Sequence, residues 1–330
     1  MGGNEKPLAD IPLVAIHMIT CNHKKYIEKA VRSVLEQKVD FKIKLVLTDD
    51  ASDDGTSEIC QGLAKAYPDL FDYVRHNTRM GASVTSAENL LRCFASGAKY
   101  CAVLDGDDYW CDMEKLKKQV AILESKPQQF ALCFTDVNYV NEEDEVVECN
   151  VMAGFYAGKG AATQKDILTY KALSTQTVLF AIDEIDRQLP VNFNKVYNGD
   201  SYIFAMLAKN RDAAYLNEVT AHYCMHTGGI MTGLAQEGRI KKTQGSLRYM
   251  ITRPELKPDT KEGVRKRIVD LQVQVLDILR NGGYVSLYVK EFFVYLFLSA
   301  SLFEWKQLPY QLRMFFRVTF QYFRLKLLPQ

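Results

Sequence analysis

Short apolar runs alternate with segments of helical spacing along the first two thirds of the chain. Residues 13–19 and 100–104 are apolar stretches of strand length, whereas apolar residues between 24 and 37 recur every three to four positions. This alternation predicts an α/β fold with a mostly parallel, Rossmann-like sheet flanked by helices. The predicted strands are 13–19, 44–48, 71–75, 100–104, 131–135, 174–182 and 214–225, and the predicted helices are 24–37, 57–67, 83–97, 116–123 and 201–208.

The pattern changes near residue 235, after which only helical spacing continues. We therefore expect an α/β domain over residues 1–235 and an α-helical C-terminal extension over residues 236–330. Within these regions, the glycine-containing segment 141–170 is predicted to be a mobile loop. The proline-containing segment 252–263 is predicted to be a hinge or linker.

Charge is divided unevenly between the two regions. The 330 residues carry a net charge of +1, but residues 1–238 contribute −9 and residues 239–330 contribute +10. A basic tail on an acidic body indicates an anionic partner. Nucleic acid is not expected, because no recognisable binding motif accompanies the basic residues.

The end of the chain has the pattern of an amphipathic helix, which favours an anionic membrane surface as the partner. The alternative is a helix that packs on the first domain or on a second copy in a homodimer. Residues 284–303 are apolar but are interrupted by Lys290 and Glu291, so a spanning helix is not predicted. The stripe consists of Leu312, Phe316, Phe320, Phe323 and Leu327, bordered by Arg313, Arg317 and Arg324.

Cysteine usage and the N-terminus bear on location. The eight cysteines form no C-x-x-C pair and no zinc-like spacing, which is typical of reduced thiols. The first residues contain no apolar core of a signal peptide. We expect a cytoplasmic protein, either free or peripheral on the cytoplasmic face of a membrane.

Two acidic clusters follow predicted buried strands. Asp105-Gly106-Asp107-Asp108-Tyr109-Trp110 follows one strand, and a run from Asp49 to Asp54 follows another. Open α/β sheets bind ligands at the carboxyl ends of their strands, and clustered carboxylates favour a divalent cation among them. The alternative for the second cluster is a solvated turn that caps a helix. Together the clusters predict a metal-assisted nucleotide site.

Four sequence elements, taken in order, resemble the family-2 glycosyltransferases, which have the GT-A fold. Thr20-Cys21-Asn22 ends the first strand, and residues 47–56 resemble the family's Asp-rich element. Asn77-Thr78-Arg79-Met80-Gly81 and the later Asn89 resemble its Asn-containing segment, and Asp105-Gly106-Asp107 its Asp-x-Asp signature. The resemblance covers residues 11–230 and implies an inverting transferase that uses a nucleotide-sugar, with a UDP-sugar favoured.

The resemblance also implies roles for individual residues. Thr20 and Asp50 would contact the nucleobase, and Asp105 the ribose or the metal. Asp107 would hold Mg²⁺ or Mn²⁺ on the diphosphate, and His226 would complete the metal shell or bind the diphosphate. The metal would stabilise the leaving nucleoside diphosphate. The full donor-binding set is Thr20, Asn22, Asp50, Asn77, Asn89 and Asp105.

Asp200 matches the position of the family's catalytic base, which would deprotonate a hydroxyl of a glycan or lipid-linked acceptor. The alternative role for Asp200 is the N-cap of the helix 201–208. For Asp108 a supporting contact is favoured over metal binding, and for His222 a hydrogen-bonded position in a strand.

Two other classes of protein are weighed against this interpretation. A sugar-1-phosphate nucleotidyltransferase would need a glycine-rich, arginine-bearing loop after the first strand, whereas residues 20–27 contain no glycine. A catalytically silent nucleotide-sugar-binding or membrane-scaffold protein stays open, because Gly199 and Ser201 replace the family's usual Glu and Trp beside Asp200.

Overall fold

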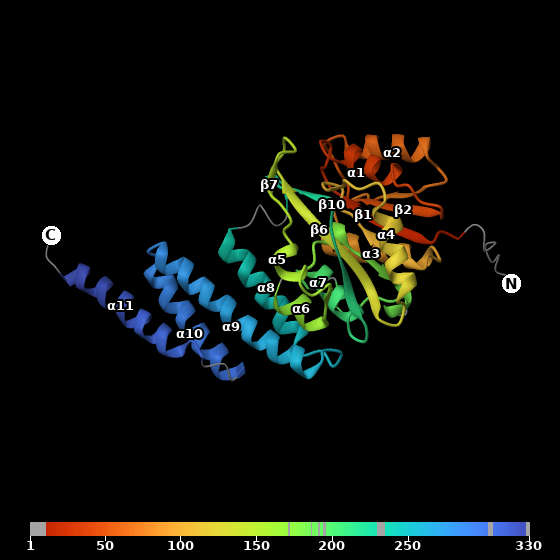
Figure 1. Cartoon of the computed structure of the whole chain (residues 1–330). Helices are drawn as coiled ribbons and strands as arrows, with labels where there is room; N and C mark the ends of the chain where they lie inside the picture. The colour runs from red at the N-terminus through yellow and green to blue at the C-terminus, as the bar shows by residue number, and fades with distance from the viewer. Residues whose placement is uncertain are drawn as a thin grey trace. The chain divides into compact units, whose positions relative to one another are not determined.

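The computed structural model divides into two compact units, Met1–Thr227 and Gly228–Gln330. Figure 1 labels the helices and strands of both units. The boundary between the two units therefore follows Thr227. That each unit has a function of its own stays a prediction. Residues 11–170, 172–185, 187–190, 192–193, 196–229, 235–302 and 306–327 are described, with side chains up to residue 320.

The first unit is built on one ten-stranded sheet with the order β3-β2-β1-β4-β9-β6-β10-β5; β7 pairs with β6 and β8 with β10. Neighbours from β3 to β4 are parallel, and β6 is parallel to β10, whereas β9 runs antiparallel between β4 and β6. The predicted α/β fold is therefore confirmed, with a mixed sheet. Its four longest pairings are parallel, whereas the antiparallel pairings of β5, β7, β8 and β9 involve two or three residue pairs each. The strands are β1 Val14–Thr20, β2 Ile43–Asp49, β3 Phe71–Arg75, β4 Tyr100–Val103, β5 Tyr109–Trp110, β6 Phe130–Val140, β7 Val146–Glu148, β8 Ala161–Ala162, β9 Leu179–Ala181 and β10 Asp212–Cys224.

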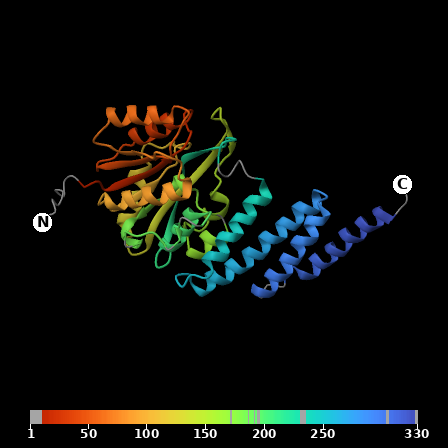
Figure 2. The same ribbon diagram turned by 180° about the vertical axis from the view of Figure 1, so that it is seen from behind.

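Helices follow most of the parallel strands and cover the sheet (Figures 1 and 2). They begin where the predicted apolar spacing begins, to within a few residues. The helices of this unit are α1 Ile27–Leu35, α2 Thr56–Ala66, α3 Ala82–Ala95, α4 Lys115–Ser125, α5 Ala153–Tyr156, α6 Gln164–Thr169 and α7 Gly199–Leu207, with short 3₁₀ turns at Thr175–Thr177 and Ile182–Ile185.

The parallel register aligns the carboxyl ends of β1 and β2, because Thr20 pairs with Asp49. The chain leaving β4 stays beside β1: the Gly106 N–H donates to the Ile19 carbonyl at 3.0 Å. The acidic segments after β2 and β4 consequently flank the end of β1. This arrangement is what positions the site.

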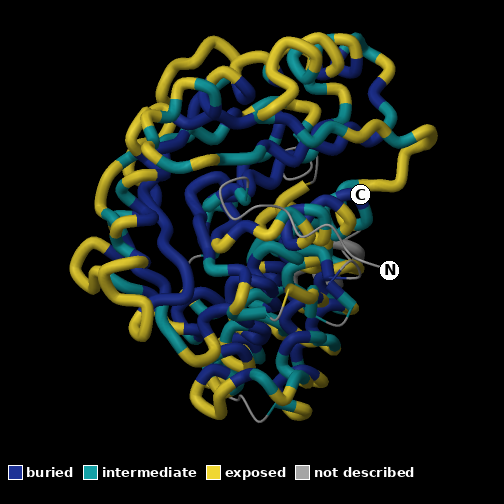
Figure 3. The backbone as a smooth tube through the Cα atoms, turned by 90° about the vertical axis from the view of Figure 1, so that its right-hand side faces the viewer, coloured by how far each residue is buried: buried dark blue, intermediate teal, exposed yellow. Residues whose placement is uncertain are grey.

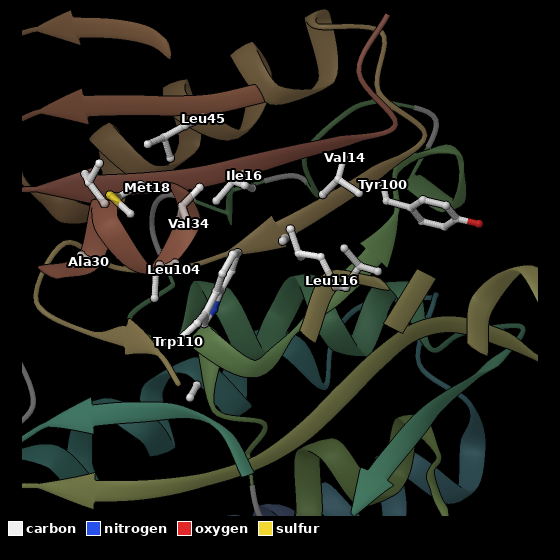
Figure 4. Packing of buried hydrophobic residues seen from close by; sticks show 14 of the residues in the cluster. Val14, Ile16, Met18, Ala30, Val34, Leu45, Tyr100, Leu104, Trp110 and Leu116 are labelled. Atoms are coloured by element: carbon white, nitrogen blue, oxygen red, sulfur yellow. The ribbon is translucent and has the colours of Figure 1, made fainter. Parts of the chain in front are cut away.

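The core is a continuous cluster between the sheet and helices α1 and α4. Figure 4 shows Trp110 among Leu104, Val34 and Leu116, all of them buried. The Trp110 indole N–H donates to the Gln176 carbonyl at 2.9 Å, so its one polar atom is satisfied inside the core. Buried strand segments appear dark blue in Figure 3, and the turns at the surface yellow.

One prediction of loop structure was wrong, and one predicted linker ends earlier than expected. Segment 141–170 contains β7, α5, β8 and α6, and is anchored by the fully buried Tyr156 and Met152. Gly158 and Gly160 lie in the turn between α5 and β8, whereas Gly154 is part of α5. These elements are too short to show a period in the sequence. The predicted linker 252–263 is shorter, because α9 already begins at Pro258, and proline is well suited to the first turn of a helix.

Among its described residues, the second unit contains helices and no strands, as the change in sequence pattern predicts. A buried polar cluster joins three of them: Glu291 accepts from Lys241 at 2.6 Å and from Gln272 at 2.8 Å, and Gln272 also accepts from Gln244 at 3.1 Å. The four helices are α8 Gln236–Met250, α9 Pro258–Asn281, α10 Val285–Leu302 and α11 Leu308–Leu327.

Candidate active site

Gly106 lets the Asp105–Asp107 segment lie directly against β1. A Cβ at this position would meet the Thr20 side chain, with Oγ1 at 2.8 Å and Cβ at 2.9 Å. Any other residue would push the segment away from the strand. The glycine between the two aspartates therefore keeps both carboxylates at the end of β1.

Three carboxylates influence one another at this point. Burial, followed by the negative charges of Asp107 and Asp200, raises the pKa of Asp105 to about 8. Asp200 lies almost one hundred residues from Asp105 along the chain, so the fold brings the predicted donor and acceptor sides together. Such a cluster is stabilised by a bound cation.

Two histidines face Asp107. Its Oδ2 atom lies 3.1 Å from His226 Nε2 and 3.6 Å from His23 Nε2. Burial opposes ionisation of Asp107, but the hydrogen bond from His226 and the charge of His23 hold its pKa below the ordinary value. The same hydrogen bond raises the pKa of His226. Asp107 is thus the carboxylate kept ionised, beside a less acidic Asp105.

On the other side of β1, Asp50 is held by a turn. Its carboxylate accepts from the Met80 and Gly81 backbone N–H groups at 2.7 and 2.8 Å, and His76 Nδ1 lies 3.0 Å away. These hydrogen bonds lower the pKa of Asp50 although burial acts against them. An ionised Asp50 can accept a further hydrogen bond, as the predicted nucleobase contact requires.

Asn22 links the loops after β1 and β2. Its Nδ2 donates to Asp53 Oδ1 at 2.9 Å, and its Oδ1 accepts from the Asp53 backbone N–H at 3.0 Å. Its backbone φ of 58° is left-handed, which asparagine tolerates better than most residues. Asn77 is exposed in the loop after β3. A direct donor contact by either residue stays a prediction.

Asn89 is placed differently from the prediction. It has no exposed surface, and its Nδ2 donates to the Val46 carbonyl at 2.9 Å and contacts His17 Nδ1 at 2.7 Å. Its Oδ1 accepts from Thr48 Oγ1 at 2.7 Å. The amide therefore ties α3 to β1 and β2. The predicted donor contact is corrected to a structural role, because nothing of the side chain reaches the surface.

Asp200 lies in the first turn of α7. The helix begins at Gly199 and its N-cap is Asn198, so the alternative role of Asp200 as the N-cap was wrong. Thr175 Oγ1 donates to Asp200 Oδ2 at 3.1 Å, and burial raises the pKa of Asp200. A carboxylate with a raised pKa is suited to proton transfer.

Asp108 and His222 occupy supporting positions. Asp108 is buried, and its Oδ1 accepts from the Cys224 backbone N–H at 2.9 Å, which joins the acidic segment to β10. His222 Nδ1 lies 2.8 Å from the Tyr109 hydroxyl across the β10–β5 pair. Both residues hold the site together from the side of β10.

A cavity of about 190 Å³ opens beside Asp107. It lies between the start of α1 and the acidic turn after β6, which are joined by ion pairs from Lys25 to Glu142 at 3.3 Å and from Lys29 to Asp144 at 2.5 Å. The lining is polar and carries both signs of charge. Its two lysines could face the phosphates of a ligand bound at Asp107.

The residues present fit a hard divalent cation. Asp105 and Asp107 offer oxygen ligands at one point, and the buried Thr20 Oγ1 and His23 Nδ1 beside them have no hydrogen-bond partner in the protein. Within the described ranges, no three His, Cys, Asp or Glu side chains form a complete metal cluster. Mg²⁺ and Mn²⁺ commonly take few protein ligands and complete their shell with water and substrate phosphates.

Two residues of the site were missed by the sequence reasoning. His23 directly follows Thr20-Cys21-Asn22 in the loop after β1, and this position was enough to suggest a contact with Asp107. Thr175 carried no such signal, because residues 174–182 were predicted to be one strand. The structure instead has a 3₁₀ turn at Thr175–Thr177, which aims the threonine at Asp200.

Comparison with known proteins identifies the class. Residues 15–172 match the family model described as Glycosyl transferase family 2, so the chain is similar to this family over these residues. The resemblance inferred from the motifs is confirmed.

Curated relatives are similar over about two thirds of the chain. An uncharacterized protein of Mycobacterium tuberculosis, Rv1520, is 28% identical over 66% of this chain and 60% of its own length. The chain thus spans less than two thirds of this relative. The Escherichia coli enzyme named UDP-Glc:alpha-D-GlcNAc-diphosphoundecaprenol beta-1,3-glucosyltransferase WfaP is 27% identical over 68% of this chain and 82% of that one.

Solved structures share the fold. TarS 1–349 of S. aureus in complex with UDP-GlcNAc has a TM-score of 0.59 at 16% identity, over 86% of this chain and 81% of that chain. The mannosyltransferase PcManGT of Pyrobaculum calidifontis, in complex with GDP-Man and Mn2+, has a TM-score of 0.55 at 19% identity. The match covers 88% of this chain and 86% of that chain. At these identities the likeness shows the GT-A fold.

Proposed function

We propose that this chain is an inverting, metal-dependent glycosyltransferase that transfers a sugar from a UDP-sugar to an acceptor hydroxyl. The observation that carries the proposal is that the Asp105-Gly106-Asp107 segment lies against the end of β1, where Asp107 faces His226 and His23. Two similar proteins support a UDP-sugar donor. The solved structure of TarS contains UDP-GlcNAc, and WfaP is named as a UDP-Glc enzyme.

The roles divide between the carboxylates. Asp105 and Asp107 would hold Mg²⁺ or Mn²⁺, with His226 and His23 beside Asp107; the ion supplies Lewis-acid stabilisation of the departing diphosphate. Asp50, Thr20, Asn22 and Asn77 would position the nucleotide. Asp200, oriented by Thr175, would take the proton of the acceptor hydroxyl.

The acceptor would be a lipid-linked or polysaccharide intermediate at the cytoplasmic face of a membrane. WfaP is named for a diphosphoundecaprenol acceptor, and another relative, TuaG of Bacillus subtilis, is named as a putative teichuronic acid biosynthesis glycosyltransferase. Both names point to envelope glycans, which supports this class of acceptor.

The proposal is tested by UDP release from a panel of UDP-sugars with Mn²⁺, with and without EDTA. Asp107→Asn should abolish metal-dependent donor binding. Asp200→Asn should retain that binding but lower kcat by about 10²-fold to 10⁴-fold, the usual contribution of a general base. Thr175→Val is the matched control that leaves the carboxylate in place, and a smaller loss is expected.

Full turnover by Asp200→Asn would contradict its role as the base. Donor binding without turnover by the unaltered protein on any acceptor tested would instead support the silent binding protein.

A further inference from the structure

The C-terminal unit carries large apolar side chains on the surfaces of α10 and α11. The exposed fractions are 60% for Phe293, 63% for Phe297, 64% for Phe316 and 69% for Phe320. Phenylalanine is normally buried, and a group of such rings on a surface marks an interaction site. We call these four residues the aromatic face.

The aromatic face is continuous across the two helices. Phe293 and Phe316 both contact Phe315, with ring centroids 6.3 and 5.7 Å apart. Phe315 also stacks on the buried Phe292 at 4.2 Å, which fixes α11 against α10. Phe297 and Phe320 each lie one helical turn further along their own helix. The two helices run side by side in both views (Figures 1 and 2).

The exposed charged residues beside the aromatic face are positive. Lys290, Arg313 and Arg317 are exposed, and α11 contains no acidic residue along its whole length. The acidic residue of α10, Glu291, is buried and bound to Lys241 and Gln272 of other helices. Among the described residues of α10 and α11, the exposed charges are therefore positive.

We propose that the aromatic face docks the protein on an anionic membrane, with α10 and α11 lying in the plane of the interface. Aromatic rings enter the boundary between headgroups and acyl chains, and basic residues are attracted to anionic lipids. A second copy of the chain fits this face less well. A two-fold contact would bring Arg313 and Arg317 near the same arginines of the partner.

An in-plane arrangement fits α10 better than a spanning one. Val285–Leu302 has the length and mean hydropathy, 1.4, of a candidate membrane span, but a third of it is buried inside the unit. Glu291 on this helix forms its ion pair with Lys241 of α8. Inserting α10 across the bilayer would break this pair or carry it into hydrocarbon, which is costly.

Flotation of the full-length protein with lipid vesicles tests the proposal directly. Vesicles of phosphatidylglycerol and phosphatidylcholine in equal parts should carry the protein, whereas vesicles of phosphatidylcholine alone should carry much less. Phe316→Glu/Phe320→Glu should abolish flotation. The matched control is Val146→Glu/Val147→Glu on β7, which makes the same change at exposed apolar residues elsewhere and should float like the unaltered chain.

The charge contribution is measured separately. Arg313→Gln/Arg317→Gln should weaken partitioning by about 25-fold, since each basic residue near an anionic surface contributes roughly fivefold. Higher salt should reduce flotation of the unaltered protein.

Three results would overturn the proposal: absence of flotation on anionic vesicles, equal loss in the β7 control, or resistance of bound protein to extraction in alkaline carbonate. The last would indicate a spanning helix. None of these measurements involves sugar transfer, so docking and the proposed activity can fail independently.

Discussion

Lys115 has no exposed surface, which is rare for lysine. Its amine donates to Gln119 Oε1 at 2.6 Å and lies 4.6 Å from the Trp110 ring. Burial lowers the pKa of Lys115 to about 7, so the folded protein holds it mostly neutral above that pH. Burial of Lys115 costs stability, because the amine regains its proton when the chain unfolds.

The pH dependence of stability follows from this shift. Between pH 7 and the ordinary lysine pKa, the unfolded chain binds a proton that the folded chain does not. Lys115 therefore makes the free energy of unfolding fall by about 1.4 kcal/mol for each pH unit as pH decreases, until the loss levels off below about 7.

Lys115→Met should remove this dependence. Urea unfolding between pH 7 and pH 10 should show that the variant gains stability relative to the unaltered protein as pH falls. The measured quantity is the difference in the free energy of unfolding between the two proteins, followed as a function of pH. A difference that is constant with pH would show that the amine is charged in the folded state.

At the scale of elements, Asn89 is the polar link between α3 and the sheet. Asn89→Ala would leave the Val46 carbonyl and Thr48 hydroxyl without their buried partner, so a loss of about 2 to 3 kcal/mol in the free energy of unfolding is expected. The exposed Asn77→Ala should change stability by less than about 0.5 kcal/mol.

The same pair of variants separates structure from binding. Donor affinity of the folded Asn89→Ala protein should stay close to that of the unaltered protein, whereas Asn77→Ala should weaken it. Normal stability with lost donor binding in Asn89→Ala would restore the original prediction that this residue contacts the donor.

At the scale of the whole molecule, charge and chemistry are divided between the units. Residues 1–227 carry a net charge of −8 and residues 228–330 a net charge of +9. The residues of the proposed donor site fall between positions 20 and 226 of the sequence, all within the first unit. The aromatic face belongs to the second unit.

A chain shortened to residues 1–227 should therefore keep Mn²⁺-dependent binding of a UDP-sugar, measured by thermal shift, and should lose flotation on anionic vesicles. A shortened chain that is folded by circular dichroism but cannot bind the donor would contradict this division of roles.

The sequence by itself determined the α/β class and the place of the acidic segments. Apolar runs of strand length are visible locally, and Asp50 and Asp105 follow such runs directly, so chain order alone puts them at strand ends. The change to helices near residue 235 is readable for the same reason, because each helix shows its own period.

Only the tertiary structure decided which of these residues meet. The approach of Asp200 to Asp105, the contact of His23 with Asp107 and the burial of Asn89 and Lys115 depend on pairings between distant segments. No local pattern encodes those distances: the order of strands in the sheet and the packing of helices on it create them. The same packing left the aromatic face of α10 and α11 exposed while Phe292 became buried.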